Sequence, residues 1–270
     1  MTCNKKSVTD LTPVGKLTNL KELDLSFTRV KNLTPLKELK SLKVLHLNST
    51  QVTSLTPLGE LKNLEVLLLF GTQVRDLAPL RELVNLKVLG LIQTQVTNLA
   101  PLGKLAKLEK LSLSETAVTN LNPLGQLTKL KELNLDKTAV TSFAPLGNFT
   151  ELTWLELSDT QVTDLTPLRK LTKLRRLDLR GTPVTNLTPI SKLTKLEHLD
   201  LSGTKVTNLT PISELTKLEW LFLTDTEVMD LTPLRKLTNL KSLFMFSSKV
   251  SESQKALLRK AIPGLKINRP

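Results

Sequence analysis

The sequence contains few of the residues around which most protein cores are built. Tyrosine is absent, and phenylalanine and tryptophan make up only 3% of the 270 residues, whereas leucine occurs 64 times. The interior must therefore consist mostly of leucine. A single cysteine, Cys3, excludes a disulfide framework and any metal site built from several thiolates. The longest uninterrupted apolar run is residues 66–70, which is too short to cross a bilayer.

Residues suited to catalysis are also scarce. Only two histidines, His46 and His198, occur. His198 is followed two positions later by Asp200, but no serine or cysteine nucleophile completes a triad with them. The sequence has no glycine-rich phosphate loop and no metal-ligand spacing. We therefore expect no enzymatic activity, no cofactor and no bound metal.

Proline is abundant and periodic. Its 14 copies argue against a helical bundle, because proline removes a backbone donor and breaks helices. Eleven of them recur every 22 residues without a slip, from Pro13 to Pro233. Threonine keeps the same period from Thr28 to Thr226, and valine keeps it from Val8 to Val250. The sequence therefore predicts eleven copies of one structural unit.

The residues of one unit predict its local structure. Leucine alternates with a variable residue at Leu23 and Leu25, which indicates a short strand with one buried face. A turn at Thr28 leads to an outer segment, where proline suits the first position of a short helical turn. We expect Thr34 at the N-cap of that turn. One coil cannot bury its own leucines, so the coils must stack in a one-dimensional array.

This unit resembles the short, 22-residue leucine-rich repeat of bacterial internalins and of the phosphatase-regulator class. The resemblance covers residues 8–250. It implies an α/β fold, a curved solenoid with a parallel β-sheet on the concave face and short 3-10 or helical turns on the convex face. Those families usually carry asparagine where this chain has threonine. A hydroxyl brings one donor where an amide brings two, so we expect a leaner hydrogen-bond spine.

The C-terminal residues predict a cap. Ser251 and Gln254 have the spacing of a capping box, and Pro263 with Gly264 should end the helix that follows. We expect this helix to cover the last coil through Ala256, Leu257, Ala261 and Ile262. The 22-residue phase places a last strand at 265–267, in which Leu265 corresponds to Leu243 and Ile267 to Met245.

The N-terminal residues predict only half a repeat. Val8, Leu11, Val14 and Leu17 occupy core positions without a strand of their own. Either residues 1–19 fold as a minimal cap, or more chain or a partner covers this edge. The predicted organisation is thus a half-repeat or minimal cap at 1–19, eleven repeats at 20–250 and a C-terminal cap at 251–270.

Residues that alternate with the inward leucines should point outward from the concave face. Seven of the nine aromatic residues occupy such positions. The predicted partner-binding residues are Trp154, Glu156, Arg176, Asp178, His198, Asp200, Trp220, Phe222, Phe244 and Phe246. The last four of these, all aromatic, should be exposed to solvent. A secondary apolar patch is predicted at Val44, Val66, Leu68, Phe70, Val88 and Ile92. These residues could instead serve only cross-strand pairing, but exposed apolar patches usually mark interaction sites.

Charge distinguishes the two sides of the predicted solenoid. The net charge is +13, yet the expected concave positions carry 10 Lys/Arg and 14 Asp/Glu. Glu156, Asp178 and Asp200 beside Arg176 form either a solvated network or a polar rim that sets a partner's register. The basic residues should lie on the convex side and loops, with almost no aromatic residues to stack bases, so nucleic acid is an unlikely partner.

The sequence therefore predicts a non-enzymatic protein-interaction module that binds a protein partner, one with a basic edge, on its concave face. The alternative is a structural or regulatory segment of a larger multidomain protein that docks a neighbouring domain. A monomer is favoured, and no transmembrane segment is expected. Met1 is followed by polar residues, so no signal peptide is expected in this chain; secreted, cell-surface and cytoplasmic locations all stay open.

Overall fold

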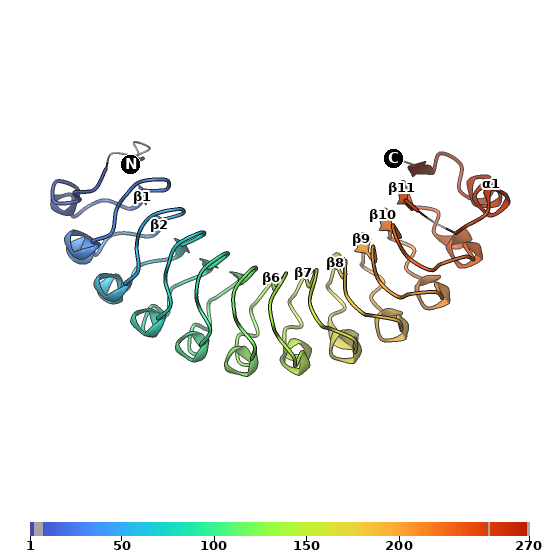
Figure 1. The fold of residues 1–270 in the computed structure, drawn as a ribbon. Helices are drawn as coiled ribbons and strands as arrows, with labels where there is room; N and C mark the ends of the chain where they lie inside the picture. The colour runs from blue at the N-terminus through green and yellow to red at the C-terminus, as the bar shows by residue number, and fades with distance from the viewer. Residues whose placement is uncertain (3–7, 248, 269–270) are drawn as a thin grey trace. The chain divides into compact units, whose positions relative to one another are not determined.

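The structure is a computed structural model that describes residues 1–2, 8–247 and 249–268. The chain forms two compact units. The first unit comprises Met1–Asn134 with Thr138–Phe149, and the second comprises Leu135–Lys137 with Thr150–Pro270. Both units are built from the same kind of coil, with a strand on one side and a short helical turn on the other (Figure 1).

The strands of each unit form a parallel ladder. In the first unit they are β1 (Glu22–Asp24), β2 (Val44–His46), β3 (Val66–Leu68), β4 (Val88–Gly90), β5 (Lys110–Ser112) and β6 (Glu132–Asn134). In the second unit they are β7 (Trp154–Glu156), β8 (Arg176–Asp178), β9 (His198–Asp200), β10 (Trp220–Phe222), β11 (Ser242–Phe244) and β12 (Lys266–Asn268). Up to β11, paired residues within a unit are 22 positions apart, as Leu23 and Leu45 are. This register confirms the predicted α/β leucine-rich-repeat solenoid.

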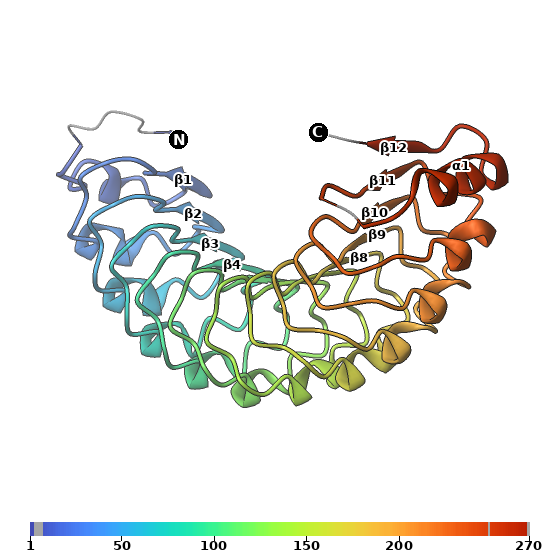
Figure 2. The same cartoon turned by 45° about the vertical axis from the view of Figure 1, so that its right-hand side comes forward.

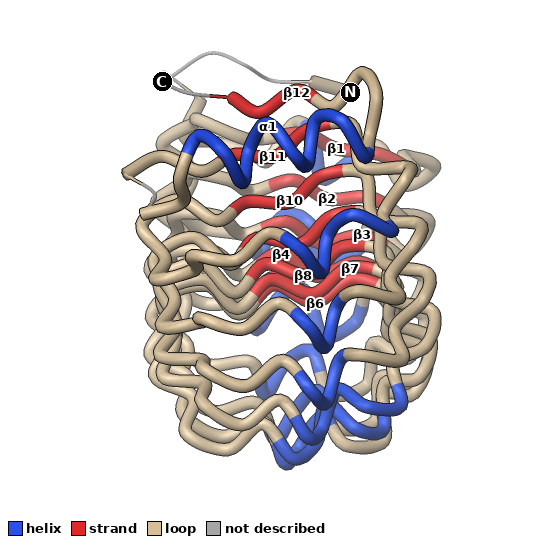
Figure 3. Tube along the Cα trace, turned by 90° about the vertical axis from the view of Figure 1, so that its right-hand side faces the viewer, coloured by secondary structure: helices blue, strands red, loops and turns tan. Residues whose placement is uncertain are grey.

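Leucine forms the core of every coil. The central strand residue faces inward and is almost fully buried, as Leu45 and Leu177 are. The strands stack on one side of the coils, and the helical turns lie on the other (Figure 3). Phe143 and Phe149 stand at leucine positions of the repeat and are buried there, so the repeat tolerates a larger side chain in its core.

The outer segments are 3-10 turns of three to five residues. They span Val14–Lys16, Thr34–Glu38, Thr56–Glu60, Ala78–Leu80, Ala100–Leu102, Asn122–Leu124, Ala144–Asn148, Thr166–Lys170, Thr188–Ile190, Thr210–Ile212 and Thr232–Lys236. In the part of the chain that the structure describes, no helix has both the length and the apolar character needed to cross a bilayer.

The prediction that Thr34 caps its helical turn is wrong. Thr34 is the first residue of the turn, and its backbone N–H donates to Asn32 Oδ1 at 2.9 Å. The same bond recurs at Asp76, Asn98, Asn120, Asp164, Asn186, Asn208 and Asp230. The cap is thus an Asx turn two residues upstream, because a short Asx side chain can accept from the backbone two residues on.

Nine of the repeated threonines close their own turns through a side-chain hydrogen bond. Thr28 Oγ1 donates to the backbone oxygen of Leu25 at 2.7 Å, and eight other threonines of the series make the same bond at 2.6–2.8 Å. The residue before each of these threonines has a positive φ, which is why glycine occurs at Gly71 and Gly181. The expected hydrogen-bond spine is therefore a series of separate bonds, each within the turn of one coil.

The C-terminal cap begins as predicted but uses another face. Helix α1 (Glu252–Ala261) begins after Ser251, whose Oγ accepts from the Gln254 N–H at 3.3 Å, and lies over the last coil (Figure 2). Lys255 and Leu258 are the buried residues of the helix, and Ile262 is buried just after it, whereas Leu257 is 48% exposed and Ala256 is exposed. Residues four apart share a helix face, and the buried pair is Leu258 and Ile262. The prediction that Leu257 covers the last coil is therefore wrong by one position.

The last strand has another register than the one predicted. Leu243 pairs with Ile267, an offset of 24 residues, and Leu265 is buried just before β12. The 22-residue phase therefore fails in the cap. An α-helix advances about 1.5 Å per residue against about 2.0 Å in a 3-10 turn, so a helical outer segment needs more residues to return the chain.

At the N-terminal end, Leu11 and Val14 are buried as predicted, but Leu17 is 44% exposed. Met1 and Thr2 lie alongside β1: the Asp24 N–H donates to the Met1 backbone oxygen at 2.9 Å. Part of the β1 edge is therefore paired with these two residues. Residues 3–7, which belong to the minimal cap predicted at 1–19, lie outside the described residues.

Candidate functional site

The ten predicted partner-binding residues all belong to the second unit. The strand register places Trp154, Arg176, His198 and Trp220 in one column across β7 to β10. A second column holds Glu156, Asp178 and Asp200, which we call the acidic column, followed by Phe222 and Phe244. The strand alternation thus brings together residues 90 positions apart in the sequence, as predicted.

The aromatic residues of this face stack on one another. We call His198, Trp220, Phe222 and Phe244 the aromatic ridge. Ring centroids lie 5.7 Å apart for His198 and Trp220, 6.4 Å for Trp220 and Phe244, and 4.3 Å for Phe222 and Phe244, and each pair is nearly parallel. Such offset stacking gives about 0.5–1.5 kcal/mol per pair beyond the area that it buries.

Stacking changes the expected exposure of these rings. Trp220, Phe222 and Phe244 are half-buried, and only Phe246 is largely exposed, at 43%. The prediction of four exposed rings is therefore correct for Phe246 alone. Each ring covers its neighbour, because one-coil spacing places the side chains within contact distance. The ridge consequently presents ring edges and part of its faces to solvent.

The other end of the face is a polar network around Trp154. The Arg176 guanidinium lies 4.6 Å above the Trp154 ring, in cation–π geometry. The Trp154 Nε1–H donates to Glu156 Oε1 at 2.8 Å. Arg176 and Glu156 also form an ion pair at 3.9 Å. Several of the charges at this end are thus satisfied within the face itself.

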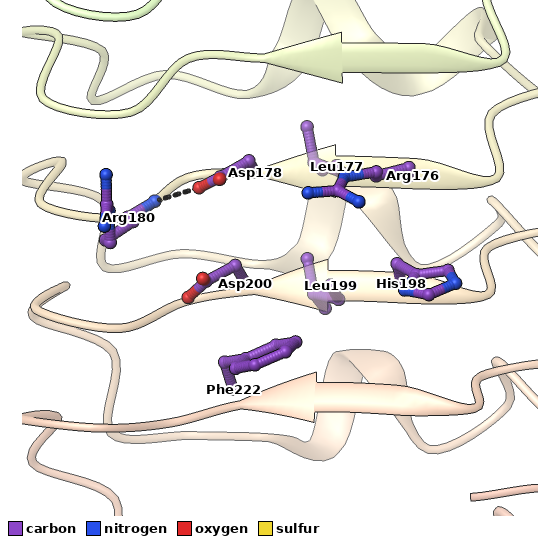
Figure 4. A pocket seen from close by; sticks show the side chains of 8 residues that line it. All are labelled: Arg176, Leu177, Asp178, Arg180, His198, Leu199, Asp200 and Phe222. Carbon is purple, nitrogen blue, oxygen red and sulfur yellow. Dashed lines mark hydrogen bonds between the residues drawn. The ribbon is translucent and has the colours of Figure 1, made fainter. Parts of the chain in front are cut away.

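Between the network and the ridge lies a hollow of about 320 Å³ (Figure 4). Its charged lining consists of Arg176, Asp178, Arg180, His198 and Asp200, with Phe222 on the next strand. Figure 4 shows the two aspartates toward one side of the hollow and Arg176 with His198 toward the other. The Asp178 and Asp200 carboxylates accept the backbone N–H groups of Arg180 and Ser202 at 2.9 and 2.8 Å. Arg180 lies on the side of the aspartates, so that side of the hollow carries both signs of charge, and the other side carries Arg176.

Burial and like charge raise the pKa of two carboxyl groups here. Burial, with the charges of Glu156 and Asp178 nearby, raises the pKa of Asp136 to about 6 even though it accepts the Ser158 N–H at 2.7 Å. Burial and the Asp178 charge also raise the pKa of Asp200. Burial, and then the Arg176 charge, lowers the pKa of His198. Asp136 and Asp200 are therefore carboxyl groups whose charged form is disfavoured by burial.

Sequence reasoning missed Asp136 and Arg180. Both stand two positions after a strand, where other coils carry serine or asparagine, as at Ser158 and Asn48. That departure from the repeat was the available signal. Among the residues with described positions, no group of histidine, cysteine or carboxylate side chains could hold a metal ion.

Replacing Asp136 by asparagine should stabilise the protein above pH 6. A folded pKa above the ordinary value means that stability falls as pH rises from about 4 to 6, where Asp136 ionises. After allowance for solvent screening we expect a gain of about 1 kcal/mol at pH 7.5 and none at pH 4. Thermal melts against pH measure it. Asp164→Asn is the control. Hydrogen bonds from Thr166 lower the pKa of Asp164, so the loss of this carboxylate should destabilise the folded protein at neutral pH. Equal pH profiles for wild type and Asp136→Asn would contradict the argument.

The predicted secondary patch lies in the first unit. Val44, Val66 and Val88 are half-buried and stand side by side on β2, β3 and β4. Leu68 lies between His46 and Gly90 in the next column. Phe70 is 36% exposed, and Ile92 is half-buried beyond the strand ends. Lys43, Glu65 and Lys87 directly precede the three valines, and Glu65 pairs with Lys43 at 2.9 Å and with Lys87 at 2.6 Å, so these charges border the patch.

Family models for leucine-rich repeats match the sequence in both units. The model described as "Leucine-rich repeat region" matches residues 137–262, and the one described as "Leucine Rich repeats (2 copies)" matches residues 18–60 and 40–82. No curated protein sequence matches the chain.

Solved structures are similar over nearly the whole chain. An internalin (inlF) from Listeria monocytogenes is 26% identical with a TM-score of 0.90, covering 97% of this chain and 79% of the internalin. A leucine-rich-repeat protein of Leptospira interrogans is 29% identical with a TM-score of 0.87, covering 95% and 74%. The plant peptide hormone receptor RGFR1 shares the fold alone, at 20% identity and a TM-score of 0.70 over 90% of this chain and 46% of the receptor. With the 22-residue register, these matches show that the chain is a leucine-rich-repeat protein of the bacterial, internalin-like type.

Proposed function

We propose that this chain is a non-enzymatic protein-interaction module whose second unit binds a protein partner on the strand face. The observation that carries the proposal is the aromatic ridge, which continues directly into the acidic column. Aromatic residues dominate the binding energy of protein interfaces, and charged groups around them set orientation and association rate. Leucine-rich-repeat proteins generally bind proteins, and the structure of the plant receptor shows it in complex with the peptide RGF2.

The charges of the face favour a partner with a basic edge. Glu156, Asp178 and Asp200 occupy neighbouring strands in one column, where like charges repel each other. Burial, together with the Asp178 charge, raises the pKa of Asp200. A lysine or arginine of a partner would relieve the repulsion. Association should therefore slow as salt screens the attraction, over a Debye length of about 8 Å at physiological ionic strength.

Removing the aromatic ridge should abolish partner capture. The double variant Trp220→Ala, Phe244→Ala removes two candidate hot spots, each worth about 2 kcal/mol or more in binding. Because these rings are half-buried, unfolding free energy should also fall, by about 1–2 kcal/mol per ring, so binding is measured well below the melting temperature. The measurement is affinity capture from an extract of the source organism with quantitative mass spectrometry.

The matched control is Phe27→Ala, Phe70→Ala. These aromatic residues of the first unit are 62% and 36% exposed, so their loss also removes exposed ring surface. The control should keep the captured protein that the Trp220, Phe244 variant loses. Equal capture by both variants would place the binding surface elsewhere. Loss of capture with Phe27→Ala, Phe70→Ala alone would move it to the first unit.

A further inference from the structure

The second unit has a basic edge on the side where the chain enters its strands. A hollow of about 340 Å³ lies there, lined by Thr153, Lys173, Arg175, Lys195, Glu197 and Lys217. Four of these six residues are cationic and one is acidic. The sequence led us to expect the basic residues on the convex side and in loops. Some of them instead border the strand face itself.

The cations of this hollow are only partly neutralised. Lys173 pairs with Glu151 at 2.6 Å, and Arg175 pairs with Glu197 at 2.5 Å. Lys195 and Lys217 are exposed, and neither has a carboxylate within 4.0 Å among the residues that the structure describes. They stand at the same position of consecutive coils. Two lysines of consecutive coils, neither in an ion pair with a described carboxylate, thus line one hollow.

A second hollow lies beside Trp220 of the aromatic ridge. It has a volume of about 500 Å³, and Trp220, Lys241, Ser242 and Lys266 are part of its lining. Ser242 takes the place that tryptophan, arginine or histidine occupies on β7 to β10, and the small side chain leaves room beside the Trp220 indole. Lys241 pairs with Glu219 at 2.7 Å. On the entry side of the strands the indole is therefore bordered by Lys241 with its partner Glu219 and, across the hollow, by Lys266.

Across the strands the charge changes sign. The basic edge lies before the strands, the aromatic ridge lies on them, and the acidic column stands at their last residues. Lys195 and Asp200 belong to one coil and are five positions apart, which corresponds to about 16 Å of extended chain. Two Debye lengths at physiological salt are of similar size, so each charge acts on its own part of a bound segment.

We infer that the second unit binds a bipolar protein segment, with an acidic residue in the hollow between Lys195 and Lys217, an apolar residue on the aromatic ridge, and a basic residue at the acidic column. This inference rests on the proposed function. About four to six residues separate the acidic and the basic residue of such a segment, because an extended chain covers roughly 3.3 Å per residue.

The charge pattern favours such a segment over a polyanion. Glu197 lines the basic hollow, and Glu219 is paired next to it with Lys241. A nucleic acid or sulfated glycan would place further negative charges against these glutamates and against the acidic column. A short acidic motif followed by a basic one satisfies both edges.

A displayed library of random 12-residue peptides, selected on the immobilised full chain, tests the inference. Peptides enriched on the wild type should carry Asp or Glu and Lys or Arg four to six positions apart, with an apolar residue between them. The variant Lys195→Glu, Lys217→Glu should reduce the enrichment of peptides with Asp or Glu at least tenfold. It should leave the enrichment of Lys or Arg unchanged. Asp178→Asn, Asp200→Asn should do the reverse. The matched control is Lys170→Glu, Lys192→Glu, exposed residues of the same unit outside the hollow, which should change neither.

The outcomes separate this inference from the proposed function. Enriched peptides that are only basic, and that are insensitive to Lys195→Glu, Lys217→Glu, would overturn the bipolar segment and leave the aromatic site standing. No enrichment over the Trp220→Ala, Phe244→Ala variant would count against the proposed function itself. Retention on heparin at physiological salt that is lost with Lys195→Glu, Lys217→Glu, with peptide selection unchanged, would assign the basic edge to polyanions and overturn the inference.

Discussion

Deleting one complete repeat should leave a folded, shorter protein, whereas deleting half a repeat should not. Removal of Leu64–Asn85 takes away one 22-residue period of the first unit and joins Asn63 to Leu86 in register. The neighbouring coils then stack on each other as before, at the cost of one coil and one interface, a few kcal/mol. Removal of Leu64–Val74 instead places outer leucines where strand leucines belong, so that coil cannot bury them. Circular dichroism melts and size-exclusion chromatography of both variants measure the difference.

The half-repeat variant should lose its cooperative melt and aggregate, because a one-half shift in phase exposes several leucines, each worth about 1.5–3 kcal/mol of burial. The 22-residue deletion should melt cooperatively as a monomer. If the two deletions gave similar melting curves, the stacked-coil basis of stability would be wrong.

Removing the C-terminal cap should have the next largest effect. Truncation after Val250 takes away α1 and β12 and uncovers the side of the last coil against which Leu258 and Ile262 pack; these residues are 1% and 2% exposed. At about 1.5–3 kcal/mol for each buried side chain, the loss of Leu258, Ile262 and Leu265 should cost roughly 5 kcal/mol or more. The unpaired edge of β11 would in addition promote association. Chemical unfolding and light scattering test both effects.

A pair of point variants tests which face of α1 is buried. Leu258→Ala should cost about 2–5 kcal/mol, as expected for a buried leucine. Leu257→Ala should cost within about 0.5 kcal/mol, because that side chain is 48% exposed. A larger cost for Leu257→Ala than for Leu258→Ala would restore the helix face expected from the sequence and refute the observed packing.

The sequence correctly predicted the features that repeat. Spacing of 22 between prolines, threonines and leucines implies equivalent backbone positions, so the strands, their parallel register and the columns of Trp154, Arg176 and His198 followed from counting. Where the sequence departs from the repeat, counting fails. The cap shows this most directly: a helical outer segment shifts Ile267 to the place expected for Leu265.

The sequence predicted which residues lie on the strand face, but not their mutual contacts, their burial or their pKa values. Alternation alone shows that Trp220, Phe222 and Phe244 leave the core on the strand face, yet it says nothing of contacts between them. Their centroid distances, down to 4.3 Å, make them half-buried partners of one another. The raised pKa of Asp136 likewise depends on burial and on the charges of Glu156 and Asp178, which only the stacked coils bring about.

By itself, the sequence determined the repeat length, the inward leucines, the parallel strands and the set of residues on the strand face. These follow from local backbone geometry, in which side chains alternate with period two and each coil repeats the last. Tertiary structure alone decided how rings stack, which carboxylates lose solvent, where cations such as Lys195 and Lys217 meet in one hollow, and how the cap closes the array. Those properties depend on distances between side chains of different coils, which periodicity does not specify.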